Sequence, residues 1–136
     1  MTKWINSTHL EDFEDNLKDY LGFIYEITLK DGRYYVGRKQ FWTSKGYQTK
    51  WQEYNSTSKT ILDAPDEIAK KEIIGIFSSK SAMRYAEAAC IFWSDSYLNP
   101  KGLNWSFDSC KGTLKLTEDD SIQLERLKHR WQTGNP

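Results

Sequence analysis

The sequence predicts an α+β fold, with a small antiparallel or mixed three-stranded sheet flanked by helices. Two β-rich runs, residues 23–29 and 33–41, enclose Asp31-Gly32, a turn dipeptide typical of a β-hairpin. Residues 81–98 hold the clearest helical pattern of the chain. Helix-like and strand-like segments alternate outside these regions, without a repeat or a low-complexity stretch.

The length of 136 residues suits one compact domain. Within it we expect an N-terminal helix in residues 1–21, a core in residues 22–107 and a C-terminal helix in residues 108–136. A capping-box pattern at Thr8 and Glu11 predicts the start of the first helix. Apolar residues follow at helical spacing, and they are Leu10, Phe13, Leu17 and Tyr20.

Alternation divides the hairpin between two faces, because successive side chains of a strand point to opposite sides. By this rule Arg38 and Lys39, in the second strand, point to opposite faces. One face of the first strand is expected to carry Phe23, Tyr25, Ile27 and Leu29. The other is expected to carry Ile24, Glu26 and Thr28.

The segment after the hairpin is predicted to be mostly irregular. Polar residues 43–50 indicate a loop, and a short helix is expected to begin near Ser58 and to end before Pro65. A helical turn then leads into a strand at about residues 72–77.

The second half of the chain is predicted to be mainly helical. Residues 103–107 form a short expected strand, and Thr117 is expected to cap a last helix that ends near Trp131. The long helix before them is capped by Ser78, Ser79 or Ser81. Its inward stripe comprises Met83, Ala86 and Cys90, with either Ala89 or Trp93.

The charge balance does not favour a polyanionic partner for the molecule as a whole, since 19 bases offset 19 acids. The charges are nevertheless unevenly placed along the chain. Residues 10–20 contain five acids and one lysine, whereas residues 30–50 contain six bases and one acid. A basic face is therefore compatible with zero net charge.

Cysteine usage argues against a disulfide-stabilised protein, and hydropathy argues against a membrane-spanning one. Cys90 and Cys110 are too few for a disulfide framework, and His9 and His129 lie far apart in the sequence. The chain shows no N-terminal signal pattern and no apolar run close to the roughly 20 residues that cross a bilayer. We expect a cytoplasmic protein without a membrane partner.

The hairpin gathers groups suited to phosphate chemistry. Phosphodiester hydrolysis needs a water with a base near it, cations beside the phosphoryl oxygens and usually a divalent metal. Tyrosine, with an ordinary pKa near 10, is a poor base at neutral pH unless Lys or Arg charges favour its phenolate. The hairpin places within reach of one another Tyr25, Tyr34, Tyr35, Arg38 and Lys39.

Glu87 is a candidate metal ligand in the long helix. It lies between Ala86 and Ala88, and burying a carboxylate without a partner is costly. Mg²⁺ is often held by one or two carboxylates together with waters and substrate phosphates, so one glutamate suffices. An ion pair with Arg84, three residues earlier, is the alternative interpretation.

The hairpin motifs resemble the signature of the GIY-YIG nuclease family. The sequence has FIY at residues 23–25, then nine residues, then YVG at 35–37. The similarity extends over roughly residues 22–107 and is greatest to a branch of phage-encoded endonucleases and a type II restriction enzyme. Later blocks of the family are matched by residues 50–59, 77–92 and 102–107.

This resemblance implies a DNA endonuclease that uses Mg²⁺ or Mn²⁺ to hydrolyse phosphodiester bonds. Tyr25 would be the general base, Tyr35 would help to place the water or phosphate, and Lys39 would polarise the Tyr25 phenol. Without the resemblance, strand packing is the more usual role for such tyrosines. Four further roles are implied: a catalytic cation at Lys50, a phosphate neighbour at Tyr54, the metal ligand at Glu87 and a distal polar residue at Asn104.

Two departures from the family pattern leave an alternative open. Trp42 stands where the restriction-enzyme branch has histidine, and Lys50 replaces an arginine that can grip two phosphate oxygens at once. Arg38 is a candidate to supply the missing guanidinium. The alternative is a weakened nuclease-fold protein that binds DNA or a protein partner without cutting.

DNA is the expected partner, and a homodimer is a second one. A single site cuts one strand, so duplex cleavage needs two protomers or sequential nicks. Trp42 and Tyr47 flank the basic loop and could stack on bases, whereas Trp51 is assigned to the core. Ser56 and Ser58 have either phosphate-binding or turn roles. The candidate DNA contacts are Arg33, Arg38, Trp42, Lys45, Ser56, Ser58 and Asn104.

Overall fold

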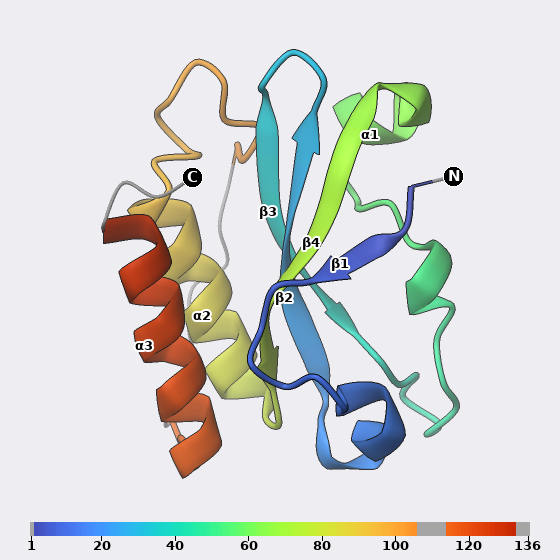
Figure 1. The fold of residues 1–136 in the computed structure, drawn as a ribbon, viewed down its shortest axis with the longest axis vertical. Helices are drawn as coiled ribbons and strands as arrows, with labels where there is room; N and C mark the ends of the chain where they lie inside the picture. The colour runs from blue at the N-terminus through green and yellow to red at the C-terminus, as the bar shows by residue number, and fades with distance from the viewer. Residues whose placement is uncertain (1, 106–113, 133–136) are drawn as a thin grey trace.

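The computed structural model describes residues 2–105 and 114–132, which form a mixed sheet with helices against it (Figure 1). The sheet has four strands in the order β1-β4-β2-β3. β2 is antiparallel to both of its neighbours, and β1 is parallel to β4. The α+β prediction is confirmed, with one strand more than expected. The strands are β1 (Trp4–Asn6), β2 (Gly22–Leu29), β3 (Tyr34–Gln40) and β4 (Ile68–Phe77).

The additional strand is β1, in the segment that was assigned to the N-terminal helix. Trp4 aligns with Lys71 of β4, and Asn6 with Ile73. Three residues are too few to show an alternating pattern, so this strand arises from pairing with β4 rather than from a local preference.

The β2–β3 hairpin forms as predicted. Gly32 in the turn has φ +91°, a conformation that glycine adopts at no steric cost. Tyr25 lies opposite Gly37 across the hairpin, and Phe23 lies opposite Lys39. These pairs place the two family motifs side by side in the sheet.

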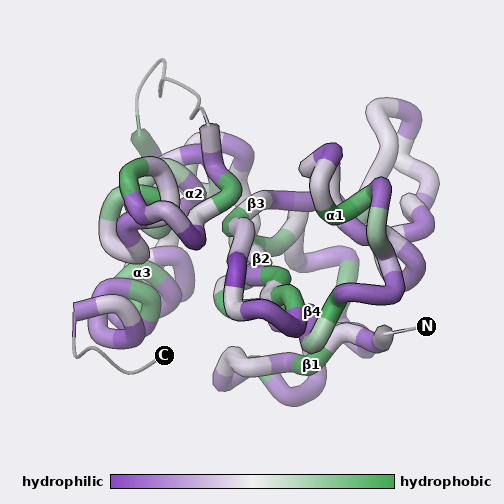
Figure 2. The backbone as a smooth tube through the Cα atoms, turned by 90° about the horizontal axis from the view of Figure 1, so that it is seen from above, coloured by the Kyte–Doolittle hydropathy of each residue, from purple (hydrophilic) through white to green (hydrophobic). Residues whose placement is uncertain are grey.

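The two faces of the sheet are covered differently. α2 (Lys80–Trp93) and α3 (Glu118–Gln132) pack on the face that carries Ile24 and Val36. The other face, with Phe23 and Tyr25, is covered by the N-terminal segment and by residues 41–61. Figure 2 shows the strands on end between the α2–α3 pair and the side that holds α1 (Lys59–Asp63).

The first predicted helix is a 3₁₀ helix, Phe13–Asp19, that begins five residues after the expected cap. Thr8 is not its cap, because the Thr8 hydroxyl donates to Asn6 Oδ1 at 2.6 Å and accepts from the Leu10 N–H at 3.2 Å. Asn16 has φ −120°, which interrupts regular helical geometry. The predicted apolar contacts of Phe13 and Leu17 are nevertheless formed, since both are buried.

The two long helices begin as predicted. Ser79 Oγ accepts from the Ala82 N–H at 3.2 Å at the start of α2. Thr117 and Asp120 form a reciprocal capping box before α3, with bonds of 3.0 and 3.1 Å. The inward stripe of α2 is confirmed, because Met83, Ala86 and Cys90 are buried.

The predicted strand at residues 103–107 is wrong where the structure describes it, at residues 103–105; residues 106 and 107 lie outside the described ranges. The backbone of Lys101 and Leu103 instead bonds Tyr34 on the edge of β3, at 3.0 and 2.8 Å. The Asn104 side chain then accepts from Val36 N–H at 2.9 Å and donates to Val36 O at 2.7 Å. Its amide thereby replaces the peptide group of a neighbouring strand.

A membrane-crossing helix is absent from residues 2–105 and 114–132, since none there is both long and apolar enough.

Candidate active site

Three phenols meet beside Gly37 on one face of the hairpin. The ring of Tyr25 lies 6.2 Å from that of Tyr35 and 5.9 Å from that of Tyr54, measured between centroids. A Cβ atom added at Gly37 would lie 2.4 Å from Tyr25 Oη and 2.9 Å from Tyr35 Cε2. The glycine of the YVG motif is therefore required for space, because any side chain would displace the phenol. We call Tyr25, Tyr35 and Tyr54 the tyrosine cluster.

Tyr25 is the innermost member of the tyrosine cluster, with 1% of its surface exposed. Burial raises its pKa well above the ordinary value, and the phenols of Tyr54 and Tyr35 raise it further. Its phenol bonds Ser56 and Tyr54; the bond with Ser56 acts in the opposite direction and favours the phenolate. Tyr25 is therefore a neutral phenol at neutral pH.

Lys39 contacts Tyr54, the neighbour of Tyr25 in the tyrosine cluster. Its ammonium lies 4.5 Å from the centroid of the Tyr54 ring. The pKa of Tyr25 is raised, chiefly by burial of its phenol, and polarisation of that phenol by Lys39 stays a prediction.

Tyr54 is the member of the tyrosine cluster on which the charge of Glu87 acts. Burial raises the pKa of Tyr54, while hydrogen bonds with Tyr25 and Thr57 oppose the rise. The charge of Glu87 also raises this pKa. The charge of Glu87 thus acts on the Tyr54 phenol, although Glu87 belongs to α2 on the other side of β3.

Arg38 and Glu87 form the second half of the site. Arg38 Nη1 lies 2.7 Å from Glu87 Oε1, and the two side chains are 22% and 15% exposed. Arg38 is paired with Ile24, which faces α2, whereas Lys39 reaches Tyr54 on the opposite face. The predicted divergence of Arg38 and Lys39 is thus confirmed. β3 is the outer strand of the sheet, so the two halves lie on the two faces of an edge strand.

Glu87 has the chemistry to hold a hard divalent cation. The described residues contain no group of three or more His, Cys, Asp or Glu side chains that would form a complete metal cage. A single carboxylate still fits Mg²⁺ or Mn²⁺, which retain waters and take phosphate oxygens as ligands. Because Arg38 already occupies Oε1, a cation there competes with a guanidinium.

Comparison with known proteins decides the family. The model described as "Putative endonuclease segE, GIY-YIG domain" matches residues 4–103, which include the tyrosine cluster and Glu87. The chain belongs to the GIY-YIG endonuclease family. It is also 31% identical over 118 residues to Intron-associated endonuclease 2 of Enterobacteria phage T4. That similarity covers 81% of this chain and 46% of the relative, so the chain spans less than half of the phage protein's length. No solved structure matches the chain significantly.

Two predicted DNA contacts of this GIY-YIG domain are wrong, because their side chains face inward. Ser56 is 4% exposed and bonds Tyr25. Asn104 is 3% exposed and closes the edge of β3. Trp42 is half-buried, and its Nε1–H donates to Tyr20 O at 2.9 Å. The assignment of Trp51 to the core is confirmed at 2% exposure.

The remaining predicted contacts lie at the surface of the GIY-YIG domain. Lys45 and Lys50 are exposed on the loop between β3 and Trp51. Arg33 is bound to Asp31 at 2.8 Å in the hairpin turn. Ser58 precedes α1 and is half-buried, without a side-chain bond that caps the helix.

Sequence reasoning missed one member of the site, Thr57. Its hydroxyl lies 3.4 Å from the Tyr35 hydroxyl and hydrogen-bonds Tyr54. The run of hydroxyl residues at 56–58 was visible in the sequence, but its position beside the phenols depends on pairing between distant segments.

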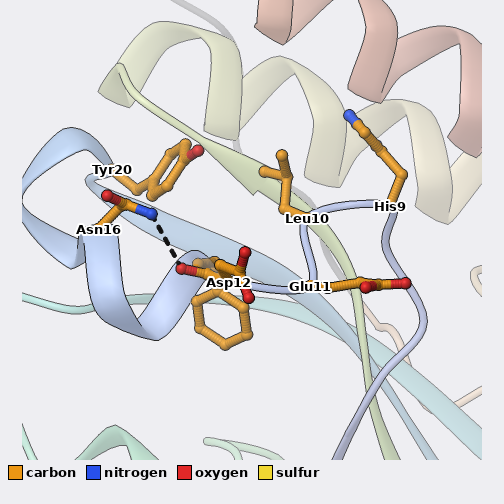
Figure 3. Close-up of a pocket in the computed structure, with 7 residues that line it drawn as sticks. His9, Leu10, Glu11, Asp12, Asn16 and Tyr20 are labelled. Carbon is orange, nitrogen blue, oxygen red and sulfur yellow. Dashed lines mark hydrogen bonds between the residues drawn. The ribbon is translucent and has the colours of Figure 1, made fainter.

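A shallow pocket near the N-terminus is unrelated to the GIY-YIG motifs (Figure 3). Asn16 Nδ2 donates to Asp12 O at 3.1 Å on its wall. Its two carboxylates would repel phosphate, so the pocket is unsuited to a nucleic-acid backbone. It is lined by His9, Leu10, Glu11, Asp12, Phe13, Asn16 and Tyr20.

Proposed function

We propose that the protein is a DNA endonuclease that hydrolyses one phosphodiester bond per site. The observation that carries the proposal is the packing of three phenols against Gly37, with Glu87 bound at 2.7 Å to Arg38, the next residue of the same strand. Membership of the GIY-YIG endonuclease family supports the same conclusion.

The tyrosine cluster acts as the base in its singly deprotonated form. Three phenols in contact titrate as a unit, so the negative charge is shared among them. The Ser56 hydroxyl stabilises that charge at Tyr25, and the Lys39 ammonium stabilises it at Tyr54. The cluster takes a proton from the attacking water as the water oxygen bonds to phosphorus. The bond from phosphorus to the leaving oxygen breaks in the same displacement.

Glu87 would hold the divalent cation, which supplies electrostatic stabilisation of the leaving oxygen when it is bound. Arg38 then exchanges Glu87 for a phosphate oxygen of the DNA. In this way Arg38 supplies the planar guanidinium that Lys50 cannot. Lys45 and Lys50 remain on the exposed loop as contacts for neighbouring phosphates.

A second candidate function is DNA binding without cleavage. The observation that favours it is the 2.7 Å contact between Arg38 and Glu87, which occupies the proposed metal ligand. A protein in which this contact persists on DNA would bind phosphates and fail to position the cation.

Nicking of supercoiled plasmid distinguishes the two functions. Wild-type protein, Tyr25→Phe and Glu87→Ala are each incubated with plasmid in Mg²⁺, in Mn²⁺ and in EDTA. Cleavage by the wild type in either metal, with none in EDTA and a large loss in both variants, supports the endonuclease. A plasmid that stays intact with all three proteins, yet is shifted on a gel in a salt-dependent way, supports the binding protein.

A further inference from the structure

Lys71 is a buried lysine in the middle of the sheet. It lies in β4, and none of its surface is exposed. Its ammonium donates to Asn55 Oδ1 at 2.8 Å and lies 4.4 Å from the centroid of the Trp4 ring. Both contacts are with neutral groups. Burial lowers the pKa of Lys71 to about 8. An apolar side chain of similar length would fill the site without the desolvation cost of an ammonium group.

The contact with Lys71 holds a strained segment. Asn55 is followed by Ser56, whose φ of +97° is unusual for a residue with a side chain. Ser56 Oγ accepts from the Ser58 N–H at 2.9 Å, and its hydroxyl bonds the Tyr25 phenol. Backbone strain of this kind persists only where the surroundings enforce it, and it is concentrated at functional sites.

A continuous path therefore joins Lys71 to the tyrosine cluster. The ammonium of Lys71 fixes the Asn55 amide, the next residue is Ser56, and Ser56 bonds Tyr25. Tyr54, on the other side of Asn55, carries the second phenol. One contact thus anchors the segment that supplies two groups around Tyr25.

We propose that Lys71 is a positioning residue that, through Asn55, keeps the Ser56 hydroxyl on the Tyr25 phenol and Tyr54 beside it. The inference rests on the proposed function, because it assigns the positioned group to the base. Lys71 itself touches neither substrate nor metal.

The variants are chosen to separate positioning from bulk packing. Lys71→Met keeps the length of the side chain and removes its donor, and Asn55→Leu removes the acceptor. Asn55→Asp keeps an acceptor for the ammonium and is the conservative rescue. Lys70→Met is the matched control, because Lys70 is the adjacent lysine of β4 and its side chain is 46% exposed.

Cleavage of supercoiled plasmid by the full chain in Mn²⁺ gives kcat and KM for each variant. We expect kcat to fall by about 10²-fold in Lys71→Met and in Asn55→Leu, since a displacement of about 1 Å costs that much. KM stays within about threefold, because no DNA contact is removed. The double variant is no worse than either single variant, because the two residues form one contact. Asn55→Asp and Lys70→Met retain wild-type kcat.

Equal kcat in Lys71→Met and Lys70→Met would overturn the proposal. If Lys71→Met does not fold, the kcat of Asn55→Leu is compared with that of Asn55→Asp, and equal values overturn the proposal.

A second readout does not depend on cleavage. It is the NMR signal of the Tyr25 ring carbon that bears the hydroxyl, measured in tyrosine-labelled protein. It moves in Lys71→Met and Asn55→Leu and is unchanged in Lys70→Met. An unmoved signal also overturns the proposal. If the wild-type protein does not cut DNA, but the Tyr25 signal still moves in Lys71→Met and Asn55→Leu, the endonuclease is contradicted and the positioning role stands.

Discussion

The buried ammonium of Lys71 predicts a specific dependence of stability on pH. Burial lowers the pKa of Lys71 from its ordinary 10.5 to about 8. The unfolded chain therefore binds this proton up to about pH 10.5, whereas the folded chain releases it above about pH 8. Between these values the unfolded state binds more protons, so the stability contributed by this group rises with pH. Below pH 8 both states bind the proton, and the buried charge costs about 3 kcal/mol.

The perturbation that isolates this effect is Lys71→Met, which removes the titrating group. From pH 7 to pH 9 the wild type should gain about 1.4 kcal/mol of stability relative to the variant, because that interval spans about one unit above the folded pKa. Cys90 also changes the stability of each protein with pH, since burial raises the pKa of its thiol to about 12. Both proteins contain Cys90, so its contribution cancels in the difference.

Urea unfolding followed by tryptophan fluorescence at pH 7, 8 and 9 measures this difference. The two proteins must show equal m values, which establishes that the variant has not altered the unfolded state. A difference in unfolding free energy that stays constant from pH 7 to pH 9 would refute the reasoning. It would mean that Lys71 titrates in the folded protein as it does in water.

Three further predictions concern the site itself. Gly37→Ala should destabilise the protein by about 1–3 kcal/mol and abolish nicking, because its Cβ would meet Tyr25 Oη at 2.4 Å; urea unfolding with wild-type stability would contradict this. Arg38→Gln should bind Mn²⁺ about tenfold more tightly in calorimetry, a gain of about 1.4 kcal/mol from removing the cation that competes for Glu87; equal or weaker binding would count against the competition. The nicking rate should climb steadily from pH 7 to pH 9, because the pKa values of Tyr25 and Tyr54 are raised and the deprotonated cluster is scarce at neutral pH; a rate that is level over this range would exclude the phenols as the base.

The hairpin could be predicted from the sequence because its determinants are local. Asp31-Gly32 specifies the turn, and strict alternation assigns Tyr25 and Ile24 to opposite faces. The capping box at Thr117 is similarly encoded within four residues and forms as expected. In these elements short-range preference and tertiary packing favour the same structure.

The features that sequence reasoning missed depend on contacts between distant residues. Asn104 lies in the segment that was predicted as a strand, but it joins β3 through its side chain, 68 residues after Val36, and no local pattern predicts that contact. Lys71 was expected to lie before the strand at residues 72–77, and only the structure shows that it is buried in β4 with Asn55 beside it. Lys39 was assigned to Tyr25, whereas its ammonium lies 4.5 Å from the centroid of the Tyr54 ring, a contact between distant segments that no local pattern predicts.

The tyrosines and Glu87 are also far apart in the sequence, so local patterns do not predict that they act together. Their sequence separation gives no reason to expect a shared site, and the family resemblance supplied that expectation. In the structure they lie on opposite faces of β3, the outer strand, and the charge of Glu87 raises the pKa of Tyr54. Because β3 is the outer strand, the proposed function has groups from both of its faces act on one phosphate at this edge.

Single-turnover cleavage by a double variant tests most directly whether Tyr25 and Glu87 belong to one catalytic unit. Rates are measured in Mn²⁺ for the wild type, Tyr25→Phe, Glu87→Gln and the two changes combined. Residues that act as a unit give non-additive losses, so the combined variant should cut no more slowly than the slower single variant. Losses that multiply, or single variants that cut as fast as the wild type, would contradict a single site across β3.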